Sequence, residues 1–469
     1  MKYFPTFFTS RAIIAYISVL MICAWLFVPR FLPFIWIFFG LLSVFSFFYF
    51  SSFLTIRWKD IPNNSFIKKI FISSIIIRII YVTFIYFFYI AKTGSPFEFF
   101  AGDSVGYHGE ANWLMDSFYY KGGIKYYFTQ YLEGVSDSGW PFIIALIYLF
   151  SFKSIFMVRL LNAFVSSLMV VLIYKTARRN FGEKAARITS VMAMLLPAFI
   201  YYSGLHLKET FMIFLLMAFI DRGDYLLHSR NFTIGIILQV VILGTSLFFF
   251  RTVLAVAAWF ALISAFLLSS NQLMNQYKRL VIISWFIIAI PFIFSGRILS
   301  EVNEYIGLRK VNQERQMEHF ATREGANQLA KYGSAAIFIP IIIPAPFPTL
   351  VNIPEQIPAM MTNGDLFTRN VYVFFVFIAF YVLFRKKRLR SNLLLSVFLV
   401  SYLLILANSG FALSPRFHVP ALPFLLLFAG YGISQTNRTY ASYYVIYLIG
   451  ISALVIAWNW FKLAGRGLA

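Results

Sequence analysis

The sequence predicts an all-α, polytopic transmembrane helical bundle with about 12–14 membrane-spanning helices and no soluble domain. Hydrophobic residues make up 60% of the 469 residues and charged residues only 12%, whereas soluble domains are about half apolar and about a quarter charged. Runs of about 20 apolar residues recur along the whole chain, each long enough to cross a bilayer core of about 30 Å. Aromatic residues reach 20%, as expected where rings face lipid and gather at the membrane interfaces.

The apolar runs predict the positions of the spans. Helices are the expected structure because lipid cannot satisfy the polar groups of any other open backbone. The run over 140–174 is too long for one span and is interrupted by Lys153 and Arg159, which predicts a short dipping helix followed by a full span. The predicted spans are 12–28, 31–54, 70–92, 140–174, 188–203, 209–227, 231–250, 251–269, 279–295, 371–384, 391–407, 418–433 and 441–461.

The distribution of basic residues predicts the orientation of the bundle. The formal net charge is +22, but the Lys and Arg residues cluster in short loops between apolar runs, which indicates cytoplasmic loops and contact with anionic lipid rather than nucleic acid binding. The residues 93–139 instead carry six carboxylates and form the predicted first catalytic loop on the opposite, periplasmic side. One feature conflicts with this scheme, because the last span leaves Lys462 and Arg466 on the outside. The basic loops centre on 57–69, 175–187, 278–279 and 385–390.

A second large outer segment covers 296–370. Its first half reads as a polar interfacial helix, and its second half, IPIIIPAPFPTLVNIPEQIP, contains too many prolines for a regular helix. Irregular apolar backbone at membrane depth must be shielded by protein or line a cavity, so this half is expected to cover an outward-facing cavity. An ordinary Pro-rich connector is the alternative.

The N-terminus and the cysteine content add two expectations. Lys2 and Arg11 precede the first apolar run, and a second run follows without a small-residue cleavage site, which predicts a retained signal anchor. Cys23 is the single cysteine and lies within an apolar run, so it can form no intramolecular disulfide and does not indicate a thiol catalyst.

The first candidate site lies in residues 101–113, AGDSVGYHGEANW, just after the third apolar run. Asp103, Tyr107 and Glu110 are spaced i, i+4 and i+7, which places them on one face of a helix, and His108 lies in the same stretch. A carboxylate just outside the bilayer, flanked by small residues, can accept a proton from an attacking hydroxyl. The alternative is that Asp103 only caps the helix that begins at the next residue.

The second candidate site is YYSGLHLKE, residues 201–209, at an apparent helix break on the same outer face. It contains His206, Lys208 and Glu209. Charged groups at a membrane boundary are costly unless they are paired, so they often mark functional sites. The alternative is a snorkelling Lys208 paired with Glu209.

The third candidate site is NSGFALSPRFHVPALPF, residues 408–424, where Arg416 and His418 stand at the outer start of a span. An arginine there can make a bidentate contact with a phosphate. The alternative is an interfacial anchor. All three stretches fall on one side of the predicted topology, and the sequence contains no Walker loop, HExxH motif, serine nucleophile elbow or spacing that demands a metal.

These stretches resemble the GT-C membrane glycosyltransferases, in particular the family 39-like branch related to protein mannosyltransferases and aminoarabinose transferases. The resemblance is carried by GDSVGYHGEANWL, by the "G-x-P … R-L-x-N-A … A-R-R-x-F-G" pattern within 138–188, by PAFIYYSGLHLKE, and by SPRFHVPALPFLLLFAG. The motifs cover 70–225 and 405–433. The sequence departs from the family where Ser104 replaces the second adjacent carboxylate of many mannosyltransferases.

The resemblance implies a multi-pass enzyme of the bacterial inner membrane that uses a polyprenyl-phosphate-linked sugar donor and acts on a glycan, lipid or protein acceptor. Asp103 would be the general base, and the sugar would be transferred with inversion. Lys208 and Arg416 would bind the donor phosphate. The predicted substrate-binding residues are Tyr107, His108, Glu110, His206, Glu209 and His418. No cofactor or metal ligand is assigned, although a divalent metal is compatible with the chemistry.

Two other functions remain open at this point. An O-antigen polymerase or ligase would depend on arginines of 296–370 rather than on Asp103. A transporter or flippase would need polar residues near mid-membrane, internal repeats and broken helices; Arg78 is the main candidate residue for it, and the sequence shows no repeat.

Overall fold

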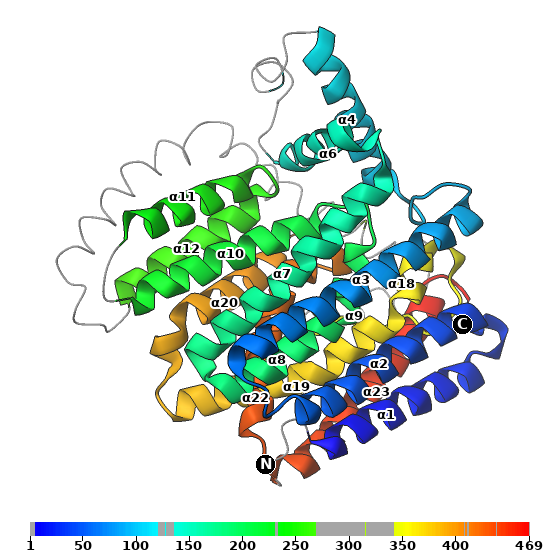
Figure 1. Ribbon diagram of the computed structural model, residues 1–469. Helices are drawn as coiled ribbons and strands as arrows, with labels where there is room; N and C mark the ends of the chain where they lie inside the picture. Colours follow the sequence, from blue (N-terminus) through cyan, green and yellow to red (C-terminus); the bar gives the residue numbers. More distant parts are fainter. Residues whose placement is uncertain are drawn as a thin grey trace.

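The computed structural model describes residues 5–120, 127, 136–229, 233–268, 315, 342–407, 409, 412–437 and 439–468. These residues form a bundle of long, roughly aligned helices (Figure 1). The described residues form no β-strand, and one isolated bridge pairs Phe31 with Val351. The helices are α1 Thr6–Leu26, α2 Phe34–Arg57, α3 Asn63–Thr93, α4 Gly102–Tyr120, α6 Gly139–Ser151, α7 Ile155–Phe181, α8 Glu183–Leu195, α9 Pro197–Ser203, α10 Glu209–His228, α11 Ile234–Phe248, α12 Thr252–Leu268, α18 Ile357–Met361, α19 Asn363–Arg385, α20 Leu393–Ala407, α21 Pro415–His418, α22 Leu422–Gln435 and α23 Thr439–Ala464.

The predicted all-α membrane bundle is confirmed. In the described part of the chain, eight helices are long and apolar enough to cross a membrane, or nine if the bent pair α8–α9 counts as one span. This number is smaller than the predicted 12–14 for identifiable reasons. The helices α6, α11 and α12 are shorter than 18 residues, α10 carries four charged residues besides its terminal histidine, and the predicted span 279–295 lies outside the described residues.

The long apolar run over 140–174 is divided as the sequence predicts. The short helix α6 ends at Ser151 and the long helix α7 begins at Ile155. Between them, Phe152 and Lys153 adopt the left-handed backbone conformation, with φ of 51° and 60°. Two consecutive left-handed residues end a helix, because side chains at positive φ crowd the backbone.

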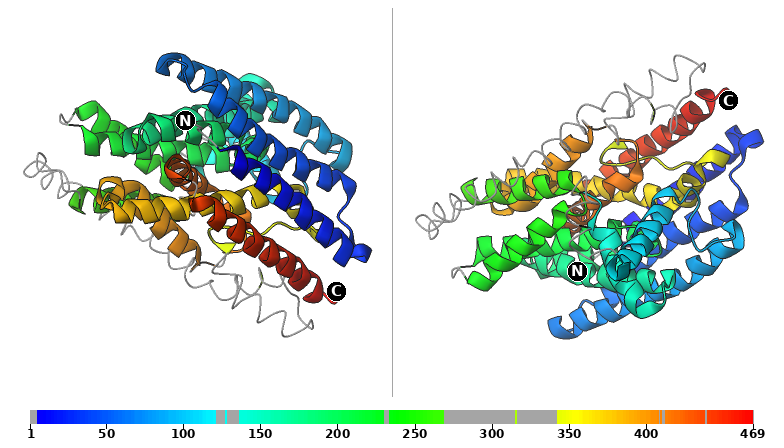
Figure 2. Two further views of the ribbon diagram at one scale, coloured as in Figure 1. Left: turned by 90° about the horizontal axis from the view of Figure 1, so that it is seen from below. Right: turned by 90° about the horizontal axis from the view of Figure 1, so that it is seen from above.

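The helices differ sharply in how much of their surface the protein covers. The apolar windows of α19 and α22 are 83% and 89% buried, whereas those of α1, α2, α3 and α23 are only 28–33% buried. The first two therefore form the centre of the bundle and the other four lie at its periphery, as two further views show (Figure 2). The exposed face of the peripheral helices is apolar, with Trp25 and Phe34 as examples, as expected of a surface in contact with lipid.

The helices α2 and α19 cross at a pair of glycines. A Cβ atom placed on Gly364 would lie 2.5 Å from the main-chain oxygen of Gly40, closer than real Cβ atoms approach. Beside this crossing, the Tyr16 hydroxyl donates to Asn363, whose amide donates to the main-chain oxygens of Trp36 and Met360. Small residues let the backbones approach, and the buried amide then joins three segments.

The span formed by α8 and α9 is bent by 46° at Leu196, immediately before Pro197. Proline has no N–H group and breaks the hydrogen-bond ladder. The guanidinium of the fully buried Arg78 donates to the main-chain oxygens of Met194 (3.3 Å) and Ala193 (3.5 Å) at the end of α8. The carboxylate of Asp365 accepts from the main-chain N–H of Ala198 (2.9 Å) at the start of α9.

The basic loops 57–69, 175–187 and 385–390 gather at one end of the bundle, in the part of Figure 1 that contains the N-terminus, and the predicted loop 278–279 lies outside the described residues. Arg187 donates to the main-chain oxygens of Trp58, Lys59 and Ile61. Lys184 donates to the main-chain oxygen of Ser434 at the end of α22. The predicted clustering of basic loops on one side is therefore what the described chain shows.

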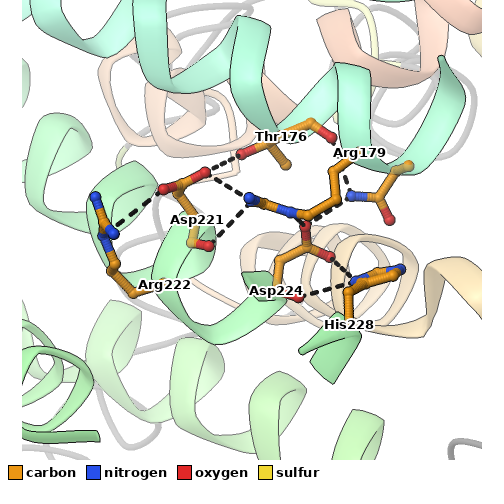
Figure 3. A network of polar contacts seen from close by, with 7 residues as sticks. Thr176, Arg179, Asp221, Arg222, Asp224 and His228 are labelled. Carbon is orange, nitrogen blue, oxygen red and sulfur yellow. Dashed lines mark hydrogen bonds and ion pairs between the residues drawn. The ribbon is translucent and has the colours of Figure 1, made fainter. Parts of the chain in front are cut away.

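A buried ionic network joins α7 to α10 (Figure 3). Arg179 forms ion pairs with both Asp221 (2.6 Å) and Asp224, whose side chains are only 3% and 2% exposed. Thr176 also donates to Asp221, and His228 lies 3.4 Å from Asp224. The two buried carboxylates are thus held by one guanidinium.

At the opposite end, the C-terminal half of the Pro-rich segment is irregular and buried. The described residues 343–353 contain no helix, and side chains satisfy main-chain oxygens of this stretch: Asn370 donates to Pro346 (2.8 Å) and Asn459 to Pro348 (3.1 Å). That this segment covers a cavity stays a prediction, and 296–314 and 316–341 lie outside the described residues.

The lysine that conflicted with the predicted topology is sequestered at this end. The Lys462 side chain is buried, and its ammonium donates to Thr349 (2.6 Å) and Gln356 (2.9 Å). A lysine held inside the protein does not need the cytoplasmic location that exposed loop lysines favour.

Candidate functional site

Three segments that are far apart in the sequence meet at the end of the bundle opposite the basic loops. Arg416 in α21 donates through Nη1 to Asp103 at the start of α4 and through Nε to Glu209 at the start of α10. A second arginine, Arg251, lies between α11 and α12 and places Nη2 3.7 Å from Glu209 Oε1. We call Asp103, Glu209, Arg251 and Arg416 the ion cluster.

The two carboxylates of the ion cluster differ in burial. The Glu209 side chain is 0% exposed and the Asp103 side chain 59% exposed, with Arg416 between them at 23%. A buried charge is tolerable only when it is paired, so Glu209 is the fixed partner that orients Arg416. Asp103 occupies the outward side, where a substrate can reach it.

The helix α4 presents one face to the ion cluster. Asp103 lies in its first turn, where a negative charge is favourable because of the helix dipole. Tyr107 is buried one turn later and interacts electrostatically with Glu209 and Arg416; burial raises its pKa. Glu110 lies a further turn along. Partial burial raises its pKa, and the charge of Lys208 offsets part of that rise. Asp103 lies within α4, which begins at Gly102, and its carboxylate contacts Arg416.

Lys208 lies next to the ion cluster with its own partners. Its ammonium donates to the main-chain oxygen of Phe250 (2.8 Å) and contacts the carboxylate of Asp137. The Lys208 side chain is 3% exposed, whereas that of Asp137 is 55% exposed. Burial and the charge of Arg251 lower the pKa of Lys208, while the carboxylates near it favour the charged form.

The two predicted histidines of this region lie beside each other, with ring centroids 6.2 Å apart. His108 is within hydrogen-bond distance of Tyr148 (2.7 Å) and Asn112 (3.1 Å). His206 is fully buried, and burial lowers its pKa to about 3, so its ring is neutral at physiological pH. Both rings contact Phe97.

The structure does not bring His418 to the ion cluster. Its ring accepts from Arg369 (3.1 Å) and donates to the main-chain oxygen of Ala412 (2.6 Å), and it is fully buried. It therefore helps to fix the chain before α21. A contact between His418 and substrate, expected from its place beside Arg416 in the sequence, stays a prediction.

Several residues that shape the site were given no role by the sequence reasoning. Arg251 lies outside the three candidate stretches of the sequence. The side-chain amide of Asn162 donates to the main-chain oxygens of Leu205 (3.1 Å) and Leu207 (3.3 Å) and so holds the segment before Lys208. The Trp140 indole donates to the main-chain oxygen of His206 (3.2 Å). Asn162 belongs to the R-L-x-N-A motif. The sequence shows this motif but does not indicate which of its residues shape the site.

No metal site is formed by the described residues, since they contain no group of three or more His, Cys, Asp or Glu side chains that could hold an ion. The cations Lys208, Arg251 and Arg416 are paired with carboxylates.

No protein-family model and no curated protein matches the sequence. Among solved structures, the chain is similar to the crystal structure of ArnT from Cupriavidus metallidurans bound to undecaprenyl phosphate, with 14% sequence identity and a TM-score of 0.39. The match covers 67% of this chain and 52% of that chain, so this chain matches about half the length of ArnT. The likeness concerns the fold alone.

Proposed function

We propose that this protein is an inverting glycosyltransferase that moves a sugar from a polyprenyl-phosphate donor to an acceptor hydroxyl at the periplasmic face of a bacterial inner membrane. The observation that carries the proposal is the double contact of Arg416 with Asp103 and Glu209. An exposed carboxylate beside buried cations, at the end of a membrane bundle opposite its basic loops, provides a proton acceptor next to a place for a lipid phosphate.

Asp103 is the proposed general base. Its carboxylate takes the proton of the acceptor hydroxyl while the hydroxyl oxygen forms a bond to the anomeric carbon of the donor. The bond between that carbon and the phosphate oxygen breaks, and its electron pair stays on the phosphate. A single displacement of this kind inverts the anomeric centre.

Lys208 and Arg416 are the proposed partners of the leaving phosphate, because preorganised cations stabilise the charge that develops there. In the structure both already contact an exposed carboxylate, Asp137 and Asp103 respectively. Exchange of Asp103 for the donor phosphate on Arg416 would therefore release the base when the donor binds.

Glu209 is proposed as a positioning residue, since it is buried and holds Arg416 from the side opposite Asp103. Tyr107, His108, Glu110 and His206 surround the same region and are proposed to contact the donor or the acceptor. We assign no substrate contact to His418. A requirement for a divalent metal stays a prediction, which removal of metal by EDTA during the transfer assay would test.

Replacement of Asp103 by Asn tests the proposal, because the amide keeps the shape and an oxygen acceptor for Arg416 but cannot take the proton. We expect transfer of labelled sugar from a polyprenyl-phosphate lipid in proteoliposomes to fall by about 10²–10⁴-fold, with unchanged yield and donor binding. Asp116→Asn is the matched control, since Asp116 lies on the same helix with a 70% exposed side chain. Full activity of Asp103→Asn would remove the proposed base.

The same assay separates the two alternatives. A polymerase or ligase would retain activity in Asp103→Asn and lose it on replacement of arginines in 296–370, most of which lie outside the described residues. A transporter would move substrate without forming a glycosidic bond. Its main candidate residue, Arg78, is fully engaged with Ser74, Ser166 and the end of α8.

A further inference from the structure

We propose that Glu98, Arg159 and His206 form the subsite that holds the sugar ring of the donor, next to the phosphate-binding cations. This assignment rests on the proposed function and specifies where the carbohydrate part of its substrate is bound. We call these three residues the sugar subsite.

The first observation is that all three side chains have buried polar atoms without a hydrogen-bond partner in the described part of the chain. These atoms are Oε2 of Glu98, Nε and Nη1 of Arg159, and both ring nitrogens of His206. Arg159 and His206 are 0% exposed. Buried polar groups in native proteins are almost always paired, and exceptions commonly mark a place that a ligand or ion completes.

Two further unpaired groups belong to the neighbouring ion cluster. Glu209 Oε2 and Arg251 Nη1, both in the ion cluster, are also buried without a partner among the described residues. Arg159 donates to the main-chain oxygen of Pro96, two residues before Glu98, and the ring of Phe97 lies against that of His206. The three residues are therefore close in space although they come from three segments. Because Glu98 also accepts from Ser104, the neighbour of Asp103, the unsatisfied groups of the sugar subsite lie beside those of the ion cluster.

Aromatic rings pack against two of these residues. The Phe97 ring lies 5.9 Å from that of His206, and the Tyr148 ring lies 6.5 Å from it and nearly parallel, at 16°. The guanidinium of Arg159 lies over the Tyr86 ring, 5.6 Å from its centroid. Apolar and aromatic walls with a few convergent polar groups are typical of small-molecule sites, and the C–H faces of a sugar ring fit such walls.

The charge of the sugar subsite favours a neutral ligand. Glu98 and Arg159 carry opposite charges that offset each other, and the His206 ring is neutral. The available groups are mixed: Arg159 donates, Glu98 accepts, and a neutral imidazole does one of each. Hydroxyl groups, which both donate and accept, match this set, whereas a phosphate matches the cationic Lys208 and Arg416.

The sugar subsite is joined to the proposed chemistry at two points. Ser104, the residue after Asp103, donates to the other oxygen of the Glu98 carboxylate. His206 lies two residues before Lys208, in the segment that Asn162 holds. A sugar bound at Glu98, Arg159 and His206 would thus have Asp103 on one side and the phosphate cations on another.

Two variants remove the polar atoms while keeping the packing. His206→Phe keeps an aromatic ring against Phe97 and removes both nitrogens, and Glu98→Gln keeps an oxygen for Ser104 and removes the charge. His228→Phe is the matched control, because His228 lies in the network of Figure 3 at the other end of the bundle. Unchanged size-exclusion profiles and melting temperatures would establish that the variants fold.

The measurement is native mass spectrometry of the full-length protein in detergent, in competition between undecaprenyl phosphate and the same lipid linked to glucose, galactose, mannose or 4-amino-4-deoxyarabinose. We expect the wild type and His228→Phe to prefer at least one sugar-linked lipid about tenfold or more. His206→Phe and Glu98→Gln should lose most of that preference and keep their affinity for undecaprenyl phosphate. This pattern would support the sugar subsite.

Other outcomes separate the two proposals. Variants that keep the wild-type preference, or a wild type that binds all these lipids equally, would overturn the sugar subsite and leave the phosphate site standing. A wild type that binds none of the lipids would refute the polyprenyl-phosphate donor. In that case the sugar subsite is retained only if methyl glycosides of the same sugars raise the melting temperature of the wild type and not of the two variants.

Discussion

Arg78 and Asp365 satisfy the two open ends of one broken membrane span. The guanidinium of Arg78 donates to the last main-chain oxygens of α8, and the carboxylate of Asp365 accepts from the main-chain N–H of Ala198 at the start of α9. A cation at a helix C-terminus and an anion at a helix N-terminus both complement the helix dipole. The bend at Leu196 sets the direction of α9, and the segment that carries Lys208 and Glu209 follows α9 in the chain.

Arg78→Met should therefore destabilise the protein more than Asp365→Asn. The methionine leaves buried oxygens of Ser74, Ser166 and Met194 without their donor, at about 1–3 kcal/mol for each unsatisfied group. The asparagine still offers an oxygen to Ala198. Melting temperatures of the purified variants in detergent check this order, and equal melting temperatures for wild type and Arg78→Met would contradict the structural role of the arginine.

The contact between Lys208 and Asp137 predicts a pH dependence of donor binding. Burial and Arg251 lower the pKa of Lys208, and an anionic donor binds the charged form. Affinity for undecaprenyl phosphate should therefore fall as the pH rises through this lowered pKa, and it should be fully present below it. Asp137→Asn removes a carboxylate that favours the ammonium, so the fall in affinity should move to lower pH.

Binding curves for undecaprenyl phosphate at a series of pH values measure this effect. Lys208→Arg is the informative comparison, because arginine does not titrate in this range and its curve should lose the alkaline limb. An Asp137→Asn curve shifted to higher pH would contradict the proposed action of Asp137 on Lys208.

Two features could be predicted from sequence because they depend on local patterns: the helices, and the location of the three candidate stretches on one side of the membrane. Apolar runs of membrane length and the alternation of basic loops placed the stretches around Asp103, Lys208 and Arg416 at one end of the bundle, and the described chain brings them together there. The pairing of Arg416 with Asp103 joins residues 313 positions apart. Such a contact depends on how α4, α10 and α21 pack, and single-sequence periodicity carries no information about that packing.

The position of His418 could not be predicted from sequence for a different reason. It stands two residues after Arg416 and was grouped with it by proximity in the sequence. Successive residues of a helix are rotated by about 100°, so residues two apart point to nearly opposite sides. Arg416 faces Asp103 and Glu209, whereas His418 faces Arg369.

Close approach of α2 and α19 predicts that Gly364 tolerates no side chain. The added methyl group of Gly364→Ala would lie 2.5 Å from the main-chain oxygen of Gly40 and 2.9 Å from its Cα, so the two helices must separate. Overpacking of this kind costs about 1–3 kcal/mol. Gly450→Ala is the control, since a Cβ there meets no atom within 4 Å; a melting temperature lowered equally by both substitutions would refute the close crossing.

The network of Figure 3 predicts that the stability of the α7–α10 pair depends on a single arginine. Arg179→Met leaves the buried Asp221 with only the partly exposed Arg222 at 3.8 Å and the buried Asp224 with only His228 at 3.4 Å. Breaking a buried ion pair in this way typically costs about 3–5 kcal/mol. Neutralising the partners as well, in Arg179→Met with Asp221→Asn and Asp224→Asn, should recover part of the loss, because no buried charge then remains unpaired. Arg222→Ala should change stability by less than about 1 kcal/mol, since Arg222 is 38% exposed and 3.8 Å from Asp221. Thermal unfolding of the wild type and these three variants in one detergent measures the series. If Arg179→Met unfolds at the same temperature as Arg222→Ala, the network does not hold these helices together.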